Sequence, residues 1–306
     1  MRRALCGNCY DRSRFHLFRR RCLRQKRSAT VAFPVGDPVK VLLCTKRDLV
    51  GNMMLNQLLP ILAPVHQVDV LLANRVRPET DSVAELGWMK AFEQDLPNRL
   101  LFPLLDAAPQ ADARLLSFRG LSARYSVPIQ EHGHIASADL TRAVQEAAPD
   151  LIVSFQFGFI FKPEALDVPR LGALNLHSGA LPERAGVNPT FWCMKDGDTH
   201  SACSLHWIDR GIDTGPIVTV RRMELDYSKS FFVNWLANYA NGAEMIAETV
   251  MALGEGQTLP AIPQDKANTR YVPKPTSADF EAFRASGRRL IDATDYLDLI
   301  GRYLPS

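Results

Sequence analysis

The sequence contains no long apolar run. A helix that spans a bilayer needs about 20 consecutive apolar residues, whereas the longest apolar stretch, Leu151 to Phe161, is shorter and is interrupted by Ser154, Gln156 and Gly158. We therefore expect a cytoplasmic protein without a membrane span. With 306 residues, 46% of them hydrophobic, the chain can bury one sizeable core.

The chain also lacks the patterns of a zinc site and of a dinucleotide site. Only Cys6 and Cys9, among six cysteines, have the spacing of a zinc-binding pair, and no second pair of Cys or His follows at a usable distance. We expect no metal. From Thr45 to Asn52 the chain lacks the G-x-G-x-x-G turn that holds a pyrophosphate. A dinucleotide-dependent oxidoreductase is therefore a remote alternative.

Basic residues are distributed unevenly. Residues 1–30 contain ten Arg or Lys and one acid, a charge of +9, so the +3 of the whole chain leaves −6 for the other residues. An acidic body argues against binding a nucleic-acid backbone, which needs clustered Lys and Arg. We predict that residues 1–37 are a basic, disordered arm, whose composition overlaps that of targeting segments. A non-catalytic nucleic-acid-binding protein that uses this arm is a distant alternative.

Strand-like and helix-like segments alternate from residue 38. Apolar runs predict strands at 39–44, 68–73, 100–105, 151–155, 203–208 and 217–220, and periodic patterns predict helices at 79–95, 137–147 and 229–252, with an earlier helix ending at Pro60. Such alternation is typical of an α/β, Rossmann-like, doubly wound fold, with a mostly parallel sheet and helices on both faces. We place this domain at 38–253. Residues 254–306 predict a short Pro-rich linker and helices near 277–287 and 289–303.

Two motifs place polar side chains together. Asn175 and His177 alternate along a predicted strand, so they face the same side, at the strand end where open α/β sheets form their ligand crevice. Asp213 lies in a turn between two glycines, where the backbone can approach a ligand. Singly, each residue fits a structural role, but together they suit acyl transfer. Asn175 and a protonated His177 can donate to an oxyanion, and Asp213 can keep His177 charged and take a proton from the amine.

The order of these residues resembles the folate-dependent formyltransferase family, which includes methionyl-tRNA formyltransferase and glycinamide ribonucleotide transformylase. The matching residues are Asn175-Leu-His177, Leu181-Pro182, Gly186, Pro189, Gly197 and Gly211-Ile-Asp213-Thr-Gly215, and the 38-residue separation of Asn175 and Asp213 agrees with the family's spacing. The resemblance implies that Asn175, His177 and Asp213 are the catalytic residues and that 10-formyltetrahydrofolate is the co-substrate. Its pterin would lie between the backbones of Phe159, Ile160 and Phe161 and of Ile208, Asp209 and Arg210.

Departures from the family pattern bear on the acceptor. Ser178-Gly179-Ala180 replaces the Ser-Leu-Leu common in the tRNA enzyme, and residues 254–306 do not resemble its C-terminal β-barrel. Segments 189–192 and 275–280 instead resemble enzymes that formylate nucleotide-linked amino sugars or hydroxyornithine-like siderophore precursors. We therefore expect a small-molecule amine as the substrate and leave a homodimer open. A methionyl-tRNA formyltransferase-like enzyme and a 10-formyltetrahydrofolate hydrolase remain alternatives.

Overall fold

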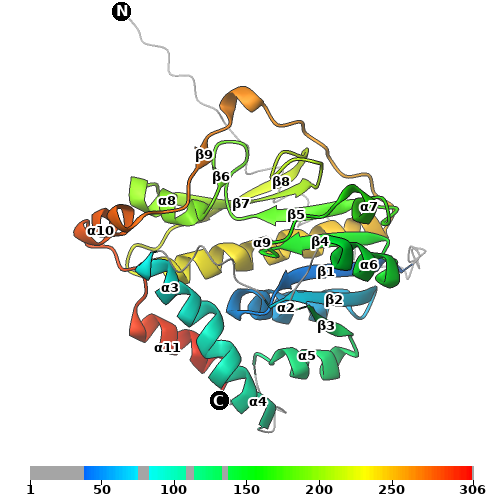
Figure 1. Cartoon of the computed structure of the whole chain (residues 1–306), viewed down its shortest axis with the longest axis horizontal. Coiled ribbons are helices and arrows are strands. Elements are labelled where there is room, and N and C mark those ends of the chain that lie inside the picture. Colours follow the sequence, from blue (N-terminus) through cyan, green and yellow to red (C-terminus); the bar gives the residue numbers. More distant parts are fainter. Residues whose placement is uncertain (1–37, 75–82, 108–113, 133–136, 305–306) are drawn as a thin grey trace, which may run out of the picture. The chain divides into compact units, whose positions relative to one another are not determined.

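A seven-stranded sheet forms the centre of the computed structural model, which describes residues 38–74, 83–107, 114–132 and 137–304 (Figure 1). The strands lie in the order β3-β2-β1-β4-β5-β7-β8. The parallel strands are β1 (Lys40–Lys46), β2 (Gln67–Ala73), β3 (Ile129–His132), β4 (Leu151–Phe155) and β5 (Ala173–His177). The last two, β7 (His200–Trp207) and β8 (Ile217–Glu224), pair antiparallel. This order confirms the predicted Rossmann-like fold with a mostly parallel sheet.

Helices and short strands make up the other described elements. The α-helices are α2 (Leu49–Leu62), α3 (Ala84–Lys90), α4 (Phe102–Ala107), α5 (Phe118–Tyr125), α6 (Ser137–Ala147), α7 (Pro163–Leu166), α8 (Pro189–Asp196), α9 (Phe231–Gly254), α10 (Ser277–Ala285) and α11 (Ala293–Gly301). The remaining elements are the π-helices η2 (Ala91–Asp95) and η3 (Pro97–Leu101), the 3-10 helix η4 (Lys266–Asn268), and the paired strands β6 (Ala185–Gly186) and β9 (Tyr271–Val272). None of the helices in the described part of the chain combines the length and the apolar character that crossing a bilayer requires.

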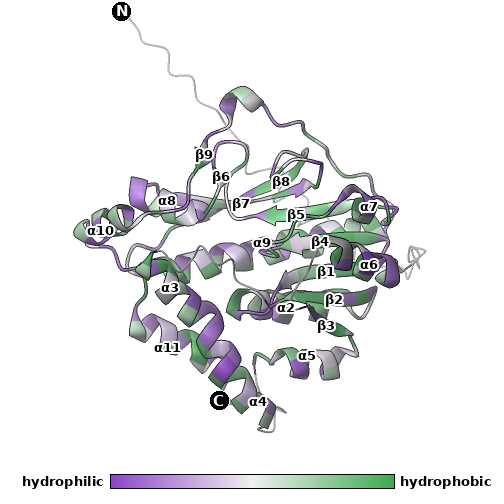
Figure 2. Ribbon diagram, viewed as in Figure 1, coloured by the Kyte–Doolittle hydropathy of each residue, from purple (hydrophilic) through white to green (hydrophobic). Residues whose placement is uncertain are grey.

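Alternate residues of the central strands face two separate cores. In β1, Leu43 belongs to the larger core and Leu42 to the smaller one. Side chains of α2 and α9 complete the larger core, and side chains of α6 and α7 complete the smaller one. Figure 2 shows the resulting concentration of hydrophobic residues in the strands. Helices therefore cover both faces, which explains why these strands are continuous apolar runs rather than alternating ones.

The segment that follows β2 differs from the prediction. We expected a strand at 100–105, but residues 84–107 form one continuous helical rod, in which η2 and η3 lie between α3 and α4. The run from Leu100 to Leu105 is apolar at nearly every position, so its sequence shows no period that could distinguish a helix from a strand. The earlier helix also continues through Pro60 to Leu62. Residues 79–82 of one predicted helix, the arm at 1–37 and the pair Cys6 and Cys9 lie outside the described residues.

The two C-terminal helices pack against the rest of the fold. The Thr276 hydroxyl accepts a hydrogen bond from the Asp279 backbone N–H, and the Asp279 carboxylate accepts one from the Thr276 backbone N–H, which caps α10 at its first turn. Phe280 and Phe283 contact Phe191 of α8, with ring centroids 4.9 and 5.0 Å apart. Both predicted C-terminal helices are thus present. The predicted domain boundaries at residues 37 and 253 stay predictions.

The strand order changes direction between β1 and β4. Open sheets of this kind bind ligands at the carboxyl ends of the strands beside such a point. The neighbouring strand β5 ends there with His177. A Cβ on Gly242 of α9 would lie 2.4 Å from the Leu176 side chain, so glycine is needed for α9 to pack this closely on β5. The fold therefore fixes β5 from below and leaves its carboxyl end open to a ligand.

Candidate active site

Strand β5 carries Asn175 and His177 on one side of the sheet. Their neighbours Leu174 and Leu176 belong to the larger core on the opposite side, which is the alternation expected of a strand. Asn175 pairs with Ser154 of β4 and with His206 of β7. The two polar side chains therefore lie where the parallel and antiparallel parts of the sheet meet.

The loop after β7 brings Asp213 to these residues. Asp213 has a backbone φ of 55°, in the left-handed region, and the loop turns sharply on both sides of it. A Cβ on Gly215 would lie 1.8 Å from the Trp207 carbonyl oxygen, so only glycine fits there. The Asp209 carboxylate accepts hydrogen bonds from the Gly211 N–H at 2.9 Å and the Thr214 hydroxyl at 2.7 Å. These contacts hold the loop in shape from within.

The C-terminal segment holds the same loop from outside. The side-chain amide of Gln264 donates to the carbonyl oxygens of Asp213 at 2.8 Å and of Gly215 at 2.7 Å. Such hydrogen bonds to the main chain fix the backbone without using the Asp213 carboxylate. The carboxylate is therefore left to face the other polar groups of the site.

The structure brings the three predicted residues together. The Asn175 amide nitrogen lies 3.3 Å from one carboxylate oxygen of Asp213, and Nδ1 of His177 lies 3.4 Å from the other. The Asp213 carboxylate thus bridges the amide and the imidazole. A group bound beside Asn175 Nδ2 and His177 Nδ1 would meet a hydrogen-bond donor and a proton-transfer group at once, which is the arrangement that acyl transfer needs.

A fourth residue, His206, belongs to this cluster, and the sequence did not single it out. Its Nε2 lies 3.1 Å from the Asn175 amide nitrogen and 3.5 Å from Asp213 Oδ1, while its Nδ1 lies 2.9 Å from the Trp207 carbonyl oxygen. Because a carbonyl only accepts, Nδ1 carries the proton, and in the neutral ring Nε2 accepts from Asn175. His206 thereby fixes which way the Asn175 amide points.

Protonation in the cluster follows from burial and from the two close histidines. Burial lowers the pKa of His177, and Asp213 and the Arg184 carbonyl offset this only in part. Burial would raise the pKa of Asp213, but the hydrogen bond with His206 and the charges of both histidines outweigh it, so that pKa lies below its usual value. The expectation that Asp213 keeps His177 charged therefore does not hold in this structure, because desolvation of the ring dominates.

The tautomer of His177 follows from a backbone contact. Its Nε2 lies 2.9 Å from the Arg184 carbonyl oxygen, which can only accept, so Nε2 carries the proton of the neutral ring. The unprotonated Nδ1 then faces Asp213. Nδ1 is thus free to take a proton from a bound ligand, and Asp213 is placed to stabilise the cation that results.

A cavity of about 430 Å³ opens over the cluster. One wall contains the predicted pterin-binding residues Phe159, Ile160, Phe161, Ile208 and Asp209, and the opposite wall contains Lys46, Gln156, Trp235 and Tyr239. Tyr271 of β9 also borders it. The sixth predicted residue, Arg210, is exposed and does not line the cavity. A cavity of this size, with apolar walls and few polar groups, suits a small organic ligand.

Two buried acids lie behind the wall formed by Gln156. The Gln156 amide donates to Glu93 at 2.5 Å, and Asp48, which is completely buried, lies next to Glu93. Burial, followed by the charge of Glu93, raises the pKa of Asp48 well above its usual value, although Lys46 acts in the opposite direction. Asp48 is therefore protonated at neutral pH, and this wall is less negative than its residue types imply.

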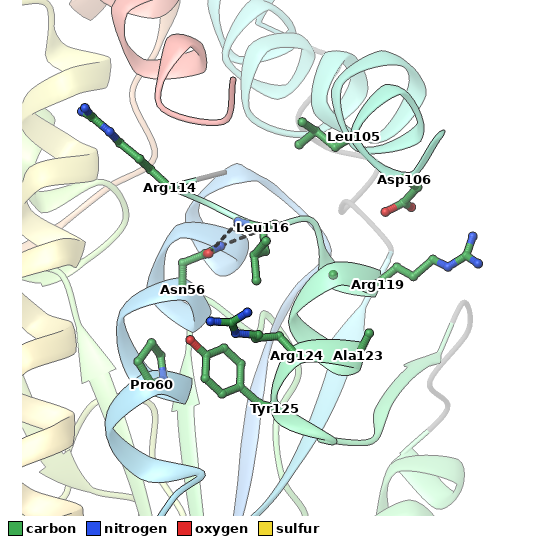
Figure 3. A pocket seen from close by; sticks show the side chains of 11 residues that line it. Asn56, Pro60, Leu105, Asp106, Arg114, Leu116, Arg119, Ala123, Arg124 and Tyr125 are labelled. Carbon is green, nitrogen blue, oxygen red and sulfur yellow. Dashed lines mark hydrogen bonds between the residues drawn. The ribbon is translucent and has the colours of Figure 1, made fainter. Parts of the chain in front are cut away.

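A second cavity, of about 570 Å³, lies elsewhere in the fold (Figure 3). Its lining includes Asn56, Arg114, Arg119, Arg124 and Tyr125. In Figure 3 the Arg124 side chain lies beside the Tyr125 ring, whereas Arg119 points away from it. This cavity is larger than the one over Asn175 but contains none of the four clustered residues, so chemistry rather than size selects the candidate active site. Among the described residues, no group of His, Cys, Asp and Glu has the makeup of a metal site.

Known proteins with similar sequences point to one family. Residues 120–231 match the family model described as formyl transferase. Over 153 residues the chain is 31% identical to methionyl-tRNA formyltransferase of Pelobacter propionicus, covering 50% of this chain and 48% of the relative. Over 162 residues it is 28% identical to that of a Synechococcus species, covering 53% and 50%. The chain thus spans about half the length of the curated relatives that it matches.

Solved structures with similar folds belong to the same group. Glycinamide ribonucleotide transformylase 1 from Symbiobacterium toebii matches with a TM-score of 0.52 and 13% identity, covering 77% of this chain and 99% of that one. Phosphoribosylglycinamide formyltransferase from Anaplasma phagocytophilum matches with a TM-score of 0.50 and 14% identity, covering 78% and 100%. At such low identity these matches show the fold alone. The segment 120–231, which carries a formyl transferase domain, contains all four clustered residues.

Proposed function

We propose that the protein transfers the formyl group of 10-formyltetrahydrofolate to a primary amine. The observation that carries this proposal is the meeting of Asn175, His177 and Asp213 at the floor of one cavity, within the segment that matches the formyl transferase model. Transfer of a formyl group needs an oxyanion to be stabilised and one proton to be moved. The three side chains supply both functions without a covalent nucleophile.

The folate carrier fits the wall that contains Phe159 to Phe161 and Ile208. Phe157 and Phe161 stack with centroids 5.6 Å apart beneath this wall, which stiffens the segment between them. A flat heterocycle such as a pterin can lie against such an apolar surface and use main-chain N–H and C=O groups for its polar edge. These residues would hold the carrier with its formyl group toward Asn175, and the opposite wall would receive the amine.

His177 would move the proton in this reaction. As the amine nitrogen forms a bond to the formyl carbon, neutral Nδ1 of His177 accepts a proton from that nitrogen. The cation is then stabilised by Asp213, 3.4 Å away. Asn175 and the new N–H of His177 donate to the oxyanion. His177 finally returns the proton to the departing folate nitrogen as its bond to the formyl carbon breaks, so the protein ends in its starting state.

Two classes of amine are candidates for the acceptor. The curated relatives are methionyl-tRNA formyltransferases, which supports an aminoacyl-tRNA. The cavity of about 430 Å³, closed on one side by Trp235, Tyr239 and Tyr271, supports a small amine such as a nucleotide-linked amino sugar or a hydroxyornithine-like compound. If water replaced the amine, the same chemistry would hydrolyse the carrier.

One assay distinguishes these outcomes. Purified protein is incubated with 10-formyltetrahydrofolate and, in parallel, with methionyl-tRNA, an amino sugar nucleotide, a hydroxyornithine or no acceptor. Release of tetrahydrofolate is followed by absorbance, and the formylated product is identified by its mass. Product with one acceptor class assigns that class, and equal release without acceptor assigns a hydrolase. If no condition exceeds the rate of the His177→Ala variant, the proposed function is wrong.

A further inference from the structure

The helical rod formed by residues 84–107 is apolar on two opposite faces. Its inward face is buried in the larger core through Leu86, Met89, Phe102 and Leu105. Its outward face exposes Trp88 (60%), Leu96 (40%), Leu100 (55%) and Leu104 (59%). A helix that only covers a core has a polar outward face, so the fold of this chain does not account for these four residues. We call them the outer stripe.

The outer stripe runs straight along the rod. Its members follow a spacing of four residues, with Phe92 filling the remaining position. In a regular α-helix each step of four residues drifts by about 40° around the axis, which would carry the stripe off one face. The π turns η2 and η3 place more residues in each turn, which cancels much of the drift. At one flank Phe92 contacts Tyr296 of α11, with ring centroids 4.9 Å apart.

The outer stripe is symmetric about Leu96. Trp88 and Leu104 lie eight residues to either side of it, and Phe92 and Leu100 lie four residues to either side. We propose that a second copy of this chain docks here, with the two rods antiparallel around a two-fold axis at Leu96. Leu96 then meets Leu96 of the second copy, and Trp88 meets Leu104. An isologous contact of this kind requires a self-complementary surface, which the stripe provides.

Charges beside the stripe fit the same arrangement. Asp95 and Arg99 lie four residues apart, and within the described part of the chain neither forms an ion pair. When two identical helices pack antiparallel, one flank of the first meets the same flank of the second. Asp95 therefore faces Arg99 of the second copy, and the contact occurs twice. A parallel arrangement would instead bring like charges together, which is unfavourable.

The area of the stripe predicts a weak dimer. A rod of 24 residues is about 36 Å long, and at a width of about 10 Å its outward face covers roughly 360 Å² per copy. Stable interfaces bury about 800 Å² per partner. Exposed Leu297 and Leu304 of the adjacent α11 enlarge the apolar surface without closing this gap. We therefore expect a dimer that dissociates on dilution.

Sedimentation velocity of the full chain over a range of concentrations tests this proposal. The wild type is expected to pass from monomer to dimer as concentration rises. Leu96→Glu and Leu100→Glu are expected to raise the dissociation constant at least about 100-fold, because like charges meet near the axis. Ile61→Glu is the matched control, since Ile61 is 46% exposed on α2 but lies outside the stripe. Thermal melts verify that each variant is folded.

The charges test the antiparallel register. Asp95→Arg is expected to weaken the dimer about tenfold, and the double change Asp95→Arg with Arg99→Asp is expected to restore it to within about threefold. A wild type that is monomeric throughout, a dimer indifferent to Leu96→Glu, or a double variant no better than the single one each overturns the proposal. A chain without residues 1–36 that dimerises when the full chain does not would assign the stripe to the arm instead.

Discussion

Replacing Asp213 by Asn removes one charge from the site and almost no volume, so it isolates the electrostatic part of the proposed mechanism. Opposite unit charges 3.4 Å apart interact by about 5 kcal/mol at an effective dielectric constant of 20. This is an upper bound, because solvent and the amide that takes the place of the carboxylate recover part of the interaction. Loss of one preorganised group of this kind costs about 10² to 10³ in kcat. Since His177 is charged only during the reaction, the loss should fall on kcat rather than on KM.

The same variant makes a directional prediction about pH. The proposed reaction needs neutral His177, so the rate falls as pH drops through the pKa of His177, which burial holds below its ordinary value of about 6.5. Asp213 raises that pKa, so Asp213→Asn should lower it further. The acid limb of kcat/KM should therefore move to lower pH while the maximum falls.

The assay is tetrahydrofolate release with a single acceptor amine, measured across pH for both proteins, so that titration of the amine itself cancels. Glu183→Gln is the matched control, because Glu183 is exposed and its replacement removes the same charge from the neighbouring loop. An acid limb that stays in place or moves to higher pH in Asp213→Asn, or a kcat within threefold of wild type, would falsify the assignment of His177 as the base.

Three further predictions concern the same site. Asn175→Ala and His177→Ala should each lower turnover by about 100-fold or more, and the double variant should be little worse than either single one, since the groups act as a unit; multiplied losses would contradict this. His206→Leu should lower kcat about tenfold, the worth of one hydrogen bond of about 1.5 kcal/mol, because Asn175 loses its acceptor, whereas His200→Leu, at the far end of β7, should not; equal effects would remove His206 from the site. Gly215→Ala should lower both Tm and kcat, because its Cβ would lie 1.8 Å from a carbonyl oxygen, while Gly87→Ala, with nothing within 4 Å, should leave both unchanged; an unchanged Gly215→Ala would show that the loop shifts freely.

The parts of the fold that follow from local pattern were predictable. β1, β4 and β5 are apolar, are buried on both faces and alternate with helical segments, so each predicts its own conformation. β3 was missed because its residues, Ile129 to His132, are mostly polar and lie at the edge of the sheet. The rod at 84–107 was misjudged at its end because apolar residues cover both of its faces. In both cases the deciding factor is what packs against the segment, which local sequence does not state.

The site divides in the same way. Asn175 and His177 could be paired from a period of two, and Asp213 from its glycines and spacing. His206 could not, because its place beside Asn175 depends on the register in which β7 pairs with β5, a contact between segments 31 residues apart. The neutral state of His177 was also out of reach, since it arises from burial under a loop that Gln264, 51 residues beyond Asp213, holds in place. Sequence therefore identified the reacting groups but not the groups that orient them.

The rod at 84–107 joins the two proposals physically. Glu93 in η2 accepts a hydrogen bond from Gln156, whose backbone is left-handed with a φ of 50° and whose side chain forms part of the acceptor wall. Three residues away on the same π turn and its neighbour, Leu96 lies at the centre of the outer stripe. A π turn is a less stable arrangement than an α turn and persists where surrounding contacts hold it. Contacts on the outward face would therefore also hold Glu93 against Gln156, which makes the shape of the acceptor wall depend on what covers the stripe.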